Sequence, residues 1–306
     1  MCYTKAEMNK LSLKTFLRKY NNDEACLEEI KNQVYPDGIT CSKCKKVTSF
    51  YKITDRMSYS CGVCRTQVYP LVGTIFQKST TPLRIWFYVI WAMTKTRSGV
   101  SARTIMRETG VTYKCAFRMC HQIRKLMADD GEPLEGKVEA DETYVGGKGM
   151  NKRYVPDFFE KKKEVLMGML AREGKIHLRH IPDSGRWTML EQIKENLRTD
   201  AIIYTDQHPS YHPLNKMGYQ HSSVNHRKEY VIKGTDIHTN SIEGFWSILK
   251  RGVSGVYTHV SPKYLQHYAD EYGFRYGNRK IGDGMFYELL RQVSVKKALQ
   301  LSVVSA

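Results

Sequence analysis

The chain has 306 residues and carries 48 lysine and arginine residues against 31 aspartate and glutamate residues, which gives a formal net charge of +17. This length predicts two or three domains with a sizeable core, and the charge exceeds what solubility requires and favours a polyanionic partner. A membrane is the rival partner, but the longest apolar run, Ile85 to Met93, is far shorter than the roughly 20 residues of a spanning helix, and nothing at the N-terminus indicates export. We therefore expect nucleic acid as the partner and no membrane.

Two helices are predicted in the first hundred residues. The first runs from Leu11 to Ile30 and ends before a Tyr-Pro-Asp-Gly turn at 35–38. The second follows Thr-Thr-Pro at 80–82, because proline is tolerated in a first helical turn, and runs from Leu83 to Thr96. Its dense aromatic and aliphatic residues favour burial in a core over a surface that stacks on bases.

Two Cys-x2-Cys pairs, separated by sixteen residues, lie between these helices: Cys41, Cys44, Cys61 and Cys64. A tetrahedral Zn²⁺ needs four soft ligands at about 2.3 Å, and two such pairs on short hairpins supply them in a zinc ribbon. Disulfides or four unrelated thiols are the alternatives, and disulfides do not suit a chain without a secretory signal. The pattern predicts one structural Zn²⁺.

A helix-turn-helix pattern follows, with a helix at 102–109, a Gly110-Val111 turn and a longer helix at 112–127. The second helix carries residues suited to phosphates and groove edges, namely Thr112, Tyr113, Lys114, Arg118, His121 and Arg124. The alternative is an ordinary helical hairpin with a solvated basic face. The nearby cysteine pairs and the positive charge favour DNA binding, so we expect contacts with DNA from Tyr113, Lys114, Arg118 and Arg124.

The second half of the chain begins at a predicted domain boundary, the Asp-Asp-Gly-Glu-Pro run at 129–133. After it come strands at 137–145, 165–171 and 175–181, a helix at 186–197 with Trp187 among its apolar positions, a strand at 201–206, and a helix at 241–251 capped by Asn240 or Ser241. This order predicts an α/β fold with a mixed sheet. The predicted domains are an N-terminal helix with the zinc ribbon at 1–79, a helix-turn-helix region at 80–130, and a ribonuclease-H-like domain with C-terminal helices at 131–306.

Three acidic residues fall at places that a ribonuclease-H-like fold brings together. Asp141 lies inside the first strand of this half, Asp206 ends the fourth strand, and Glu243 is in the first turn of the later helix. Two Mg²⁺ or Mn²⁺ ions that cleave a phosphodiester need such hard oxygen ligands. Lys250, two turns along the helix from Glu243, can reach a DNA phosphate. Each residue alone has a structural alternative, as a strand-end turn former, a charge favoured by the helix dipole, or solvated surface.

Several longer motifs resemble one known family. They are VGTIFQKS at 72–79, PLRIW at 82–86, EADETYVGG at 139–147, YTDQH at 204–208, HTNSIEGFWSILKR at 238–251, HVSPK at 259–263 and EYGFRY at 271–276. With the cysteine pairs, they look like the zinc-ribbon DDE insertion-sequence transposases related to the eukaryotic Merlin elements. The resemblance runs from the first helix to Arg279, and Gly277 departs from the usual Tyr-Asn pair.

The resemblance implies a DDE-type transposase that binds the terminal inverted repeats of its own element, hydrolyses phosphodiesters there and joins the freed 3′ hydroxyls to target DNA. It implies that Asp141 and Asp206 bind the catalytic metal, with Asn240 or Glu243 as the third ligand, and the Glu-x6-Lys spacing favours Glu243. Lys250 and Arg251 agree with the family's basic residues. The expected partners are double-stranded DNA and further copies of the chain, in a homodimer or larger assembly, at a bacterial nucleoid or in a eukaryotic nucleus.

Other classes of function fit less of the chain. A domesticated regulator that binds DNA without catalysis needs only the ribbon and the helix-turn-helix, and the intact Asp141, Asp206 and Glu243 argue against it. A structure-selective nuclease or resolvase on the same fold does not need an N-terminal ribbon for sequence-specific end binding. A zinc-ribbon transcription factor leaves the second half of the chain unexplained.

Overall fold

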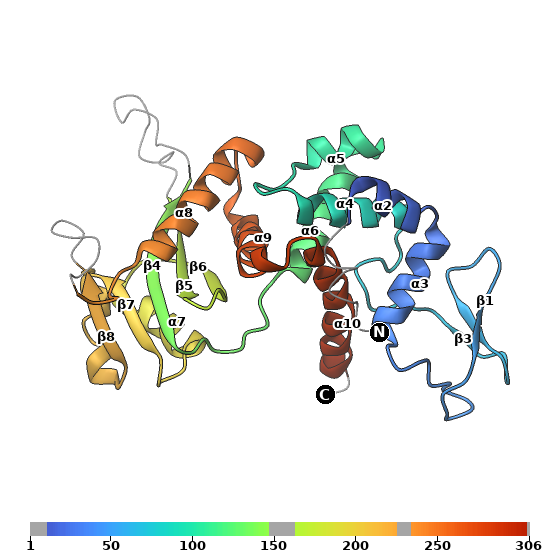
Figure 1. Cartoon of the computed structure of the whole chain (residues 1–306), viewed down its shortest axis with the longest axis horizontal. Helices are drawn as coiled ribbons and strands as arrows, with labels where there is room; N and C mark the ends of the chain where they lie inside the picture. The colour runs from blue at the N-terminus through green and yellow to red at the C-terminus, as the bar shows by residue number, and fades with distance from the viewer. Residues whose placement is uncertain (1–10, 147–162, 225–233, 305–306) are drawn as a thin grey trace. The chain divides into compact units, whose positions relative to one another are not determined.

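The computed structural model describes residues 11–146, 163–224 and 234–304 and divides the chain into two compact units (Figure 1). Unit 1 comprises residues 1–97, 102–126 and 280–306, and unit 2 comprises residues 98–101 and 127–279. The division differs from the predicted one at the C-terminus. Helix α10, Met285–Val304, packs on other helices of unit 1, so it groups with the N-terminal part of the chain.

Unit 1 begins with two short helices, α2 (Leu13–Lys19) and α3 (Asp23–Val34), where the sequence predicted one helix over 11–30. That prediction was wrong because Asn22 starts a new helix. Its Oδ1 accepts a hydrogen bond from the backbone N–H of Ala25 at 2.8 Å. Asparagine satisfies a free N–H group of a first helical turn in this way, so the chain bends between the two helices.

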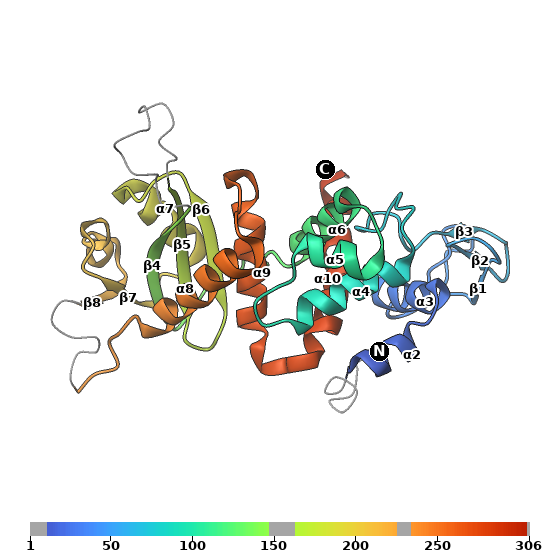
Figure 2. The same ribbon diagram turned by 90° about the horizontal axis from the view of Figure 1, so that it is seen from above.

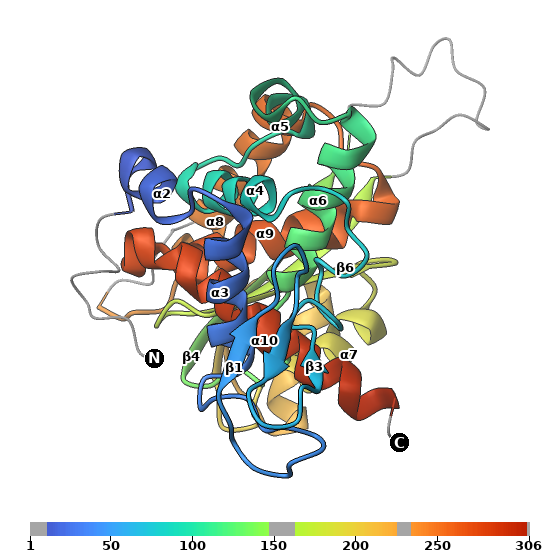
Figure 3. The same cartoon turned by 90° about the vertical axis from the view of Figure 1, so that its right-hand side faces the viewer.

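Helix α4 (Leu83–Lys95) confirms the predicted buried helix of unit 1. Trp86 and Phe87 have no solvent exposure. The ring of Phe87 meets that of Phe286, from α10, with centroids 6.0 Å apart in an edge contact. Helix α10 also packs on α3, as Figure 3 shows, so residues from both ends of the chain share one core.

The predicted ribbon and helical pair are both formed in unit 1. Three short antiparallel strands, β1 (Phe50–Lys52), β2 (Tyr59–Cys61) and β3 (Gln67–Val68), make a sheet in the order β1-β2-β3. Helices α5 (Ala102–Thr109) and α6 (Tyr113–Leu126) pack on each other. The turn between them places Gly110 at a φ of +73°, a left-handed conformation that glycine adopts without steric cost.

Unit 2 is built on a five-stranded mixed sheet in the order β6-β5-β4-β7-β8. The strands are β4 (Lys137–Val145), β5 (Glu164–Ala171), β6 (Ile176–Ile181), β7 (Ile202–Asp206) and β8 (Gln220–Val224). Strand β4 pairs antiparallel with β5 and parallel with β7, and β7 pairs parallel with β8. This arrangement agrees with the predicted ribonuclease-H-like fold. Strand β8 was not predicted, because its Gln-His-Ser-Ser run lacks apolar alternation.

Helices cover both faces of this sheet (Figure 2). Helix α7 (Arg186–Asn196) packs on one face, while α8 (Asn240–Gly252) and α9 (Leu265–Gly277) pack on the other. Trp187 of α7, which the helical spacing placed among the apolar positions, is 83% exposed. Burial of Met189, Leu190 and Ile193 turns Trp187 toward solvent.

Short turns lie between the helices and strands of unit 2 and between α9 and α10. They are 3-10 turns at Pro209–Tyr211, Leu214–Met217, Pro262–Tyr264 and Arg279–Gly284, and a π-helical turn at Val253–Tyr257. Gly147, the last residue of the EADETYVGG motif, lies outside the described residues. Across the described parts of the chain, we find no helix with the length and apolar character that crossing a membrane requires.

Candidate functional site

The four cysteines of the ribbon converge on one point. Cys41 Sγ lies 3.4 Å from Cys64 Sγ, Cys44 Sγ lies 3.9 Å from Cys61 Sγ, and all four sulfur atoms lie within 4.8 Å of one another. Four sulfur atoms bound at about 2.3 Å to a central ion would be about 3.8 Å apart. The cluster therefore fits the predicted structural Zn²⁺.

Two threonine hydroxyls favour the thiolate form of this cluster. Thr48 Oγ1 lies 3.2 Å from Cys61 Sγ, and Thr66 Oγ1 lies 3.2 Å from Cys64 Sγ. Hydrogen bonds, first with Thr48 and then with backbone N–H groups, lower the pKa of Cys61 to about 6, and those with Thr66 lower the pKa of Cys64. The hydrogen bond with Cys64 raises the pKa of Cys44 to about 12 while no metal is bound. Because thiolates bind Zn²⁺ and thiols do not, these contacts prepare the ribbon for its metal.

Helix α6 keeps only part of the surface expected to contact DNA. Tyr113, Lys114 and Arg118 are exposed. His121 and Arg124 are not, with 7% and 2% of their surfaces exposed, so the expectation that Arg124 contacts phosphates is corrected. Both lie on the stripe of α6 that packs into the core of unit 1, since residues three and four apart share a helix face.

The acidic residues of unit 2 meet on the face of the sheet that α8 covers. In the parallel pair of β4 and β7, Glu139 is beside Tyr204, and Asp141 and Asp206 each lie two residues further along their strands. Side chains two residues apart point to the same face, and Glu139 contacts α8 from that face. Burial, and then the charges of Glu142 and Asp206, raise the pKa of Asp141 to about 7.

Helix α8 fixes the orientation of Asp141. Trp246 Nε1 donates a hydrogen bond to Asp141 Oδ2 at 2.9 Å. The indole reaches this place because Gly168 of β5 pairs with Asp141, and a Cβ on Gly168 would lie 2.7 Å from Trp246 Cζ2. The sequence did not indicate this contact, because nothing in the spacing of α8 relates Trp246 to a residue on the sheet.

A further acid, Glu142, belongs to the same region and was not predicted as a site residue. Glu142 Oε2 accepts a hydrogen bond from Tyr211 Oη at 3.0 Å, and its Oε1 lies 4.0 Å from His208 Nε2. The backbone N–H of His208 donates to Asp206 Oδ1 at 2.9 Å. Burial is the main reason that the pKa of Glu142 is raised, and the charge of Asp206 adds to it. The turn after β7 therefore links the Asp206 carboxylate to Glu142.

Glu139 joins the sheet to the start of α8. Its carboxylate has no solvent exposure, and its Oε2 accepts hydrogen bonds from the backbone N–H groups of Ser241 at 2.9 Å and Ile242 at 3.1 Å. Its Oε1 accepts from Arg172 Nε at 3.0 Å and from Ser241 Oγ at 3.0 Å, and lies 3.2 Å from His238 Nδ1. We call this arrangement the Glu139 clamp.

The Glu139 clamp corrects the expected helix cap. The sequence predicted that Asn240 or Ser241 caps α8, but the N-cap residue is Thr239, whose side chain makes no capping hydrogen bond. Glu139, from a strand about a hundred residues earlier, accepts from the free N–H groups instead. Prediction of a helix cap considers only residues next to the helix start in the sequence, so it could not identify Glu139 as the acceptor.

The expected third metal ligand is not brought into a tight cluster. Glu243 is half-buried and Asn240 exposed in the first turn of α8, and Lys250 and Arg251 are exposed at its other end. Within the described ranges, the four ribbon cysteines are the compact group of His, Cys, Asp and Glu ligands, and the acids of unit 2 form no second one. A site for two ions about 3.5–4 Å apart spreads its ligands over a larger volume than a single-ion site does. Glu243 and Asn240 therefore both stay predictions for the third ligand.

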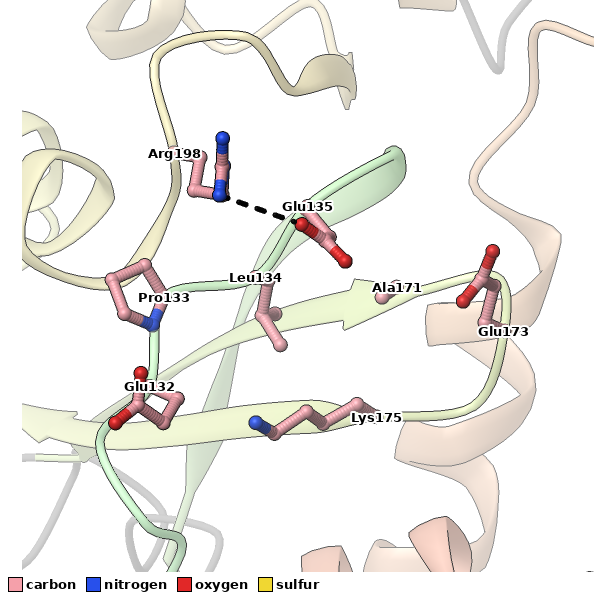
Figure 4. A pocket seen from close by; sticks show the side chains of 8 residues that line it. All are labelled: Glu132, Pro133, Leu134, Glu135, Ala171, Glu173, Lys175 and Arg198. Carbon is pink, nitrogen blue, oxygen red and sulfur yellow. Dashed lines mark ion pairs between the residues drawn. The ribbon is translucent and has the colours of Figure 1, made fainter.

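A surface pocket of unit 2 lies away from these acids, at the edge of the sheet where β4 and β6 begin (Figure 4). Its charged lining includes Glu135, which lies 3.7 Å from Arg198, together with Glu132, Glu173 and Lys175. Strand β7 ends at the opposite edge with Asp206. The pocket therefore takes no part in the candidate metal site.

The cysteine ribbon of unit 1 and the ribonuclease-H-like sheet of unit 2 define the class, a zinc-ribbon protein with a ribonuclease-H-like domain. Comparison with known proteins identifies the family within this class. Residues 133–277 match the ISXO2-like transposase domain, and residues 21–67 match the transposase zinc-ribbon domain. The chain belongs to the zinc-ribbon DDE insertion-sequence transposases of the ISXO2-like family.

Two relatives agree with this assignment. An uncharacterized protein in transposable element ISH50 of Halobacterium salinarum is 26% identical over 241 residues, which are 71% of this chain and 79% of the relative. An uncharacterized transposase-like protein of Haemophilus influenzae is 27% identical over 107 residues, which are 35% of this chain and 85% of the relative. The first relative extends the similarity well beyond either matched domain alone.

Proposed function

We propose that this protein is a DNA transposase that binds the terminal inverted repeats of its own element, cleaves a phosphodiester at each end and joins the freed 3′ hydroxyls to target DNA. The observation that supports the proposal is the β4–β7 register, which pairs Glu139 with Tyr204, two residues before Asp141 and Asp206 on their strands. Burial, and then the charges of Glu142 and Asp206, raise the pKa of Asp141, as expected of an acid that a bound cation would stabilise. Joining two ends to one target calls for at least two copies of the chain.

The residues of this site suit Mg²⁺ or Mn²⁺. Asp141 and Asp206 would hold the metal with Glu243, and Asn240 is the alternative third ligand. Hard divalent cations prefer carboxylate oxygens, and the repulsion among the buried acids is a state that a cation relieves. Bound metal would polarise the scissile phosphate and lower the pKa of the attacking water.

The chain itself supplies orientation and binding. Trp246 holds Asp141 through its Nε1 hydrogen bond, and the Glu139 clamp holds the first turn of α8 against β4. Lys250, exposed on α8, contacts DNA phosphate, and Arg251 beside it adds a second positive charge. Sequence-specific end binding is the task of unit 1, through the ribbon and the exposed residues of α6.

The decisive experiment replaces Asp141 or Asp206 by Asn in the full-length protein. Loss of a metal clamp removes several kcal/mol of transition-state stabilisation, so end cleavage and joining should each fall by at least about a thousandfold. Binding of the end duplex should survive, because the recognition surface belongs to unit 1. Asp200→Asn is the matched control, since Asp200 forms an exposed ion pair with Arg198 before β7. Normal cleavage by Asp206→Asn would disprove the mechanism.

The third ligand is tested in the same assay. Glu243→Gln should be as damaging as the aspartate changes, and Asn240→Ala should be mild. Because the N-cap residue of α8 is Thr239 and not Asn240, a large loss in Asn240→Ala cannot be attributed to a lost N-cap residue. That result, with cleavage retained in Glu243→Gln, would assign the role to Asn240 and leave the transposase proposal in place.

A further inference from the structure

Trp187 is the most exposed large apolar side chain of the described residues, at 83%. Trp86 and Trp246 are buried, which is the usual fate of an indole in a folded chain. An indole left in water does not contribute the free energy that its burial would supply to folding. An exposed tryptophan on a well-packed helix is therefore a candidate contact for a partner with an aromatic or apolar surface.

The start of α7 is fastened to the edge of the sheet that carries the acids. Ser184 O accepts a hydrogen bond from Ser210 Oγ at 3.3 Å, and Ser184 Oγ lies 2.9 Å from Tyr144 Oη. Ser210 lies four residues after Asp206, and Tyr144 lies three residues after Asp141. Ser184 thus contacts the segments that follow both aspartates at this end of the sheet, while α7 itself covers the face opposite α8. Trp187 lies one turn beyond Ser184.

Hydrogen bonds hold the turn around Trp187, and a cationic side chain is next to it in the sequence. Asp183 Oδ1 accepts hydrogen bonds from the backbone N–H of Gly185 at 2.7 Å and from Thr188 Oγ1 at 2.9 Å, which fixes the turn on both sides of Trp187. Arg186, next to Trp187, is exposed. Tyr144, held by Ser184, is 48% exposed at the same edge. An indole beside a guanidinium is the combination that stacks on a nucleobase while contacting the backbone.

We infer that Trp187 stacks on an unpaired nucleobase of the DNA end held at the acidic site, close to the scissile phosphodiester. The inference rests on the proposed function, which supplies the DNA substrate. Carboxylates repel the phosphate backbone, so an uncharged ring is a favourable contact for DNA at this edge. Stacking of a base on an aromatic side chain is worth about 1–3 kcal/mol, so its loss should weaken binding about 5–150-fold.

The test measures DNA binding by the full-length protein in magnesium-free buffer. One probe is a duplex of the sequence bordering the reading frame with three unpaired thymidines at its end, and the other is the matching blunt duplex. Trp187→Ala should bind the forked duplex at least about fivefold more weakly and the blunt duplex as the wild type does. Trp187→Phe should recover most of the difference. Met217→Ala, at another exposed apolar side chain of unit 2, is the control and should change neither affinity.

A 5-bromodeoxyuridine at the first unpaired position should crosslink on irradiation to the peptide that contains Trp187. Equal weakening on both probes, no weakening at all, or a changed self-association with unchanged DNA affinity would overturn the inference. Cleavage by the wild type with Mg²⁺ on the same duplex tests the proposed function separately. A wild type that cleaves while Trp187→Ala binds both probes normally refutes the stacking contact alone.

Discussion

Replacing Glu139 by Gln tests whether the Glu139 clamp positions α8 for catalysis. Glu139 Oε2 accepts from two backbone N–H groups, while Oε1 faces donors from Arg172 and Ser241. A glutamine amide offers one acceptor oxygen, so an oxygen that keeps the backbone bonds turns its NH₂ group toward the Arg172 guanidinium. The substitution therefore keeps the size of the side chain and its bonds to the backbone N–H groups, but removes the acceptor for Arg172.

The size of the expected loss in stability at the first turn of α8 follows from the burial of the Glu139 carboxylate. A hydrogen bond to a charged group contributes about 1.5–3 kcal/mol, and removing one partner of a buried pair costs about 3–5 kcal/mol. Arg172 keeps a second acceptor, His238 O at 3.0 Å, and an ion pair with Asp236 at 3.3 Å. We therefore expect the lower limit, about 3 kcal/mol, which makes opening of the first turn of α8 about a hundredfold more frequent.

Hydrogen exchange in the full-length protein measures this opening directly. The amides of Ser241 and Ile242 should exchange about a hundredfold faster in Glu139→Gln, and kcat for end cleavage should fall at least about tenfold with KM little changed. Glu135→Gln is the matched control, since Glu135 is exposed and lies 3.7 Å from Arg198. Wild-type exchange at both amides together with wild-type kcat would refute the positioning role.

Three further predictions concern the metal, the recognition helix and pH. Removing Zn²⁺ from the reduced protein should unfold the ribbon, measured by circular dichroism with metal analysis, because a small metal module has too little core to fold alone, and retained ribbon structure would contradict this. Arg118→Ala should weaken end binding and flatten its salt dependence, and equal salt slopes for wild type and Arg118→Ala would count against this contact with DNA. Arg124→Ala, at a buried side chain, should instead lower the melting temperature of unit 1. Because the pKa of Asp141 is raised to about 7, the folded protein binds more protons than the unfolded chain between about pH 4 and pH 7. Zinc-loaded, magnesium-free protein should therefore lose stability to urea as the pH rises through that range. If Asp141→Asn shows the same change of stability with pH as the wild type, Asp141 is excluded as the cause.

Local pattern was enough to place the main elements of the site. The strand at 137–145 was predicted with its observed bounds because apolar residues in its first half face the core under α7 and its polar residues Glu139 and Asp141 face α8. The cysteine pairs were sufficient for the ribbon, since the ligand set of Zn²⁺ is short-range and chemically specific. Both predictions use interactions between residues close in sequence.

The failures have a common physical origin in contacts between distant residues. The Glu139 clamp and the Trp246–Asp141 hydrogen bond each join residues about a hundred positions apart, and no periodicity reports them. Arg124 was placed on the DNA side because its charge suggested solvent, while the phase of α6 turns it inward. Helical spacing placed Trp187 among the apolar positions of its helix, but its side chain is exposed. Burial of a side chain depends on which helix face meets the rest of the fold, and charge or apolar character is only a partial guide to it.

The position of α10 in the chain also sets an order of assembly during synthesis. Helix α10 lies after all of unit 2 in the sequence, yet it supplies Phe286 and Leu290 to the core of unit 1. On the ribosome, residues 127–279 are complete while unit 1 still lacks this helix, and domains of a growing chain fold as units. The acidic sheet is therefore finished first. A chain that stops short of Met285 carries that sheet without a completed partner for α3 and α4.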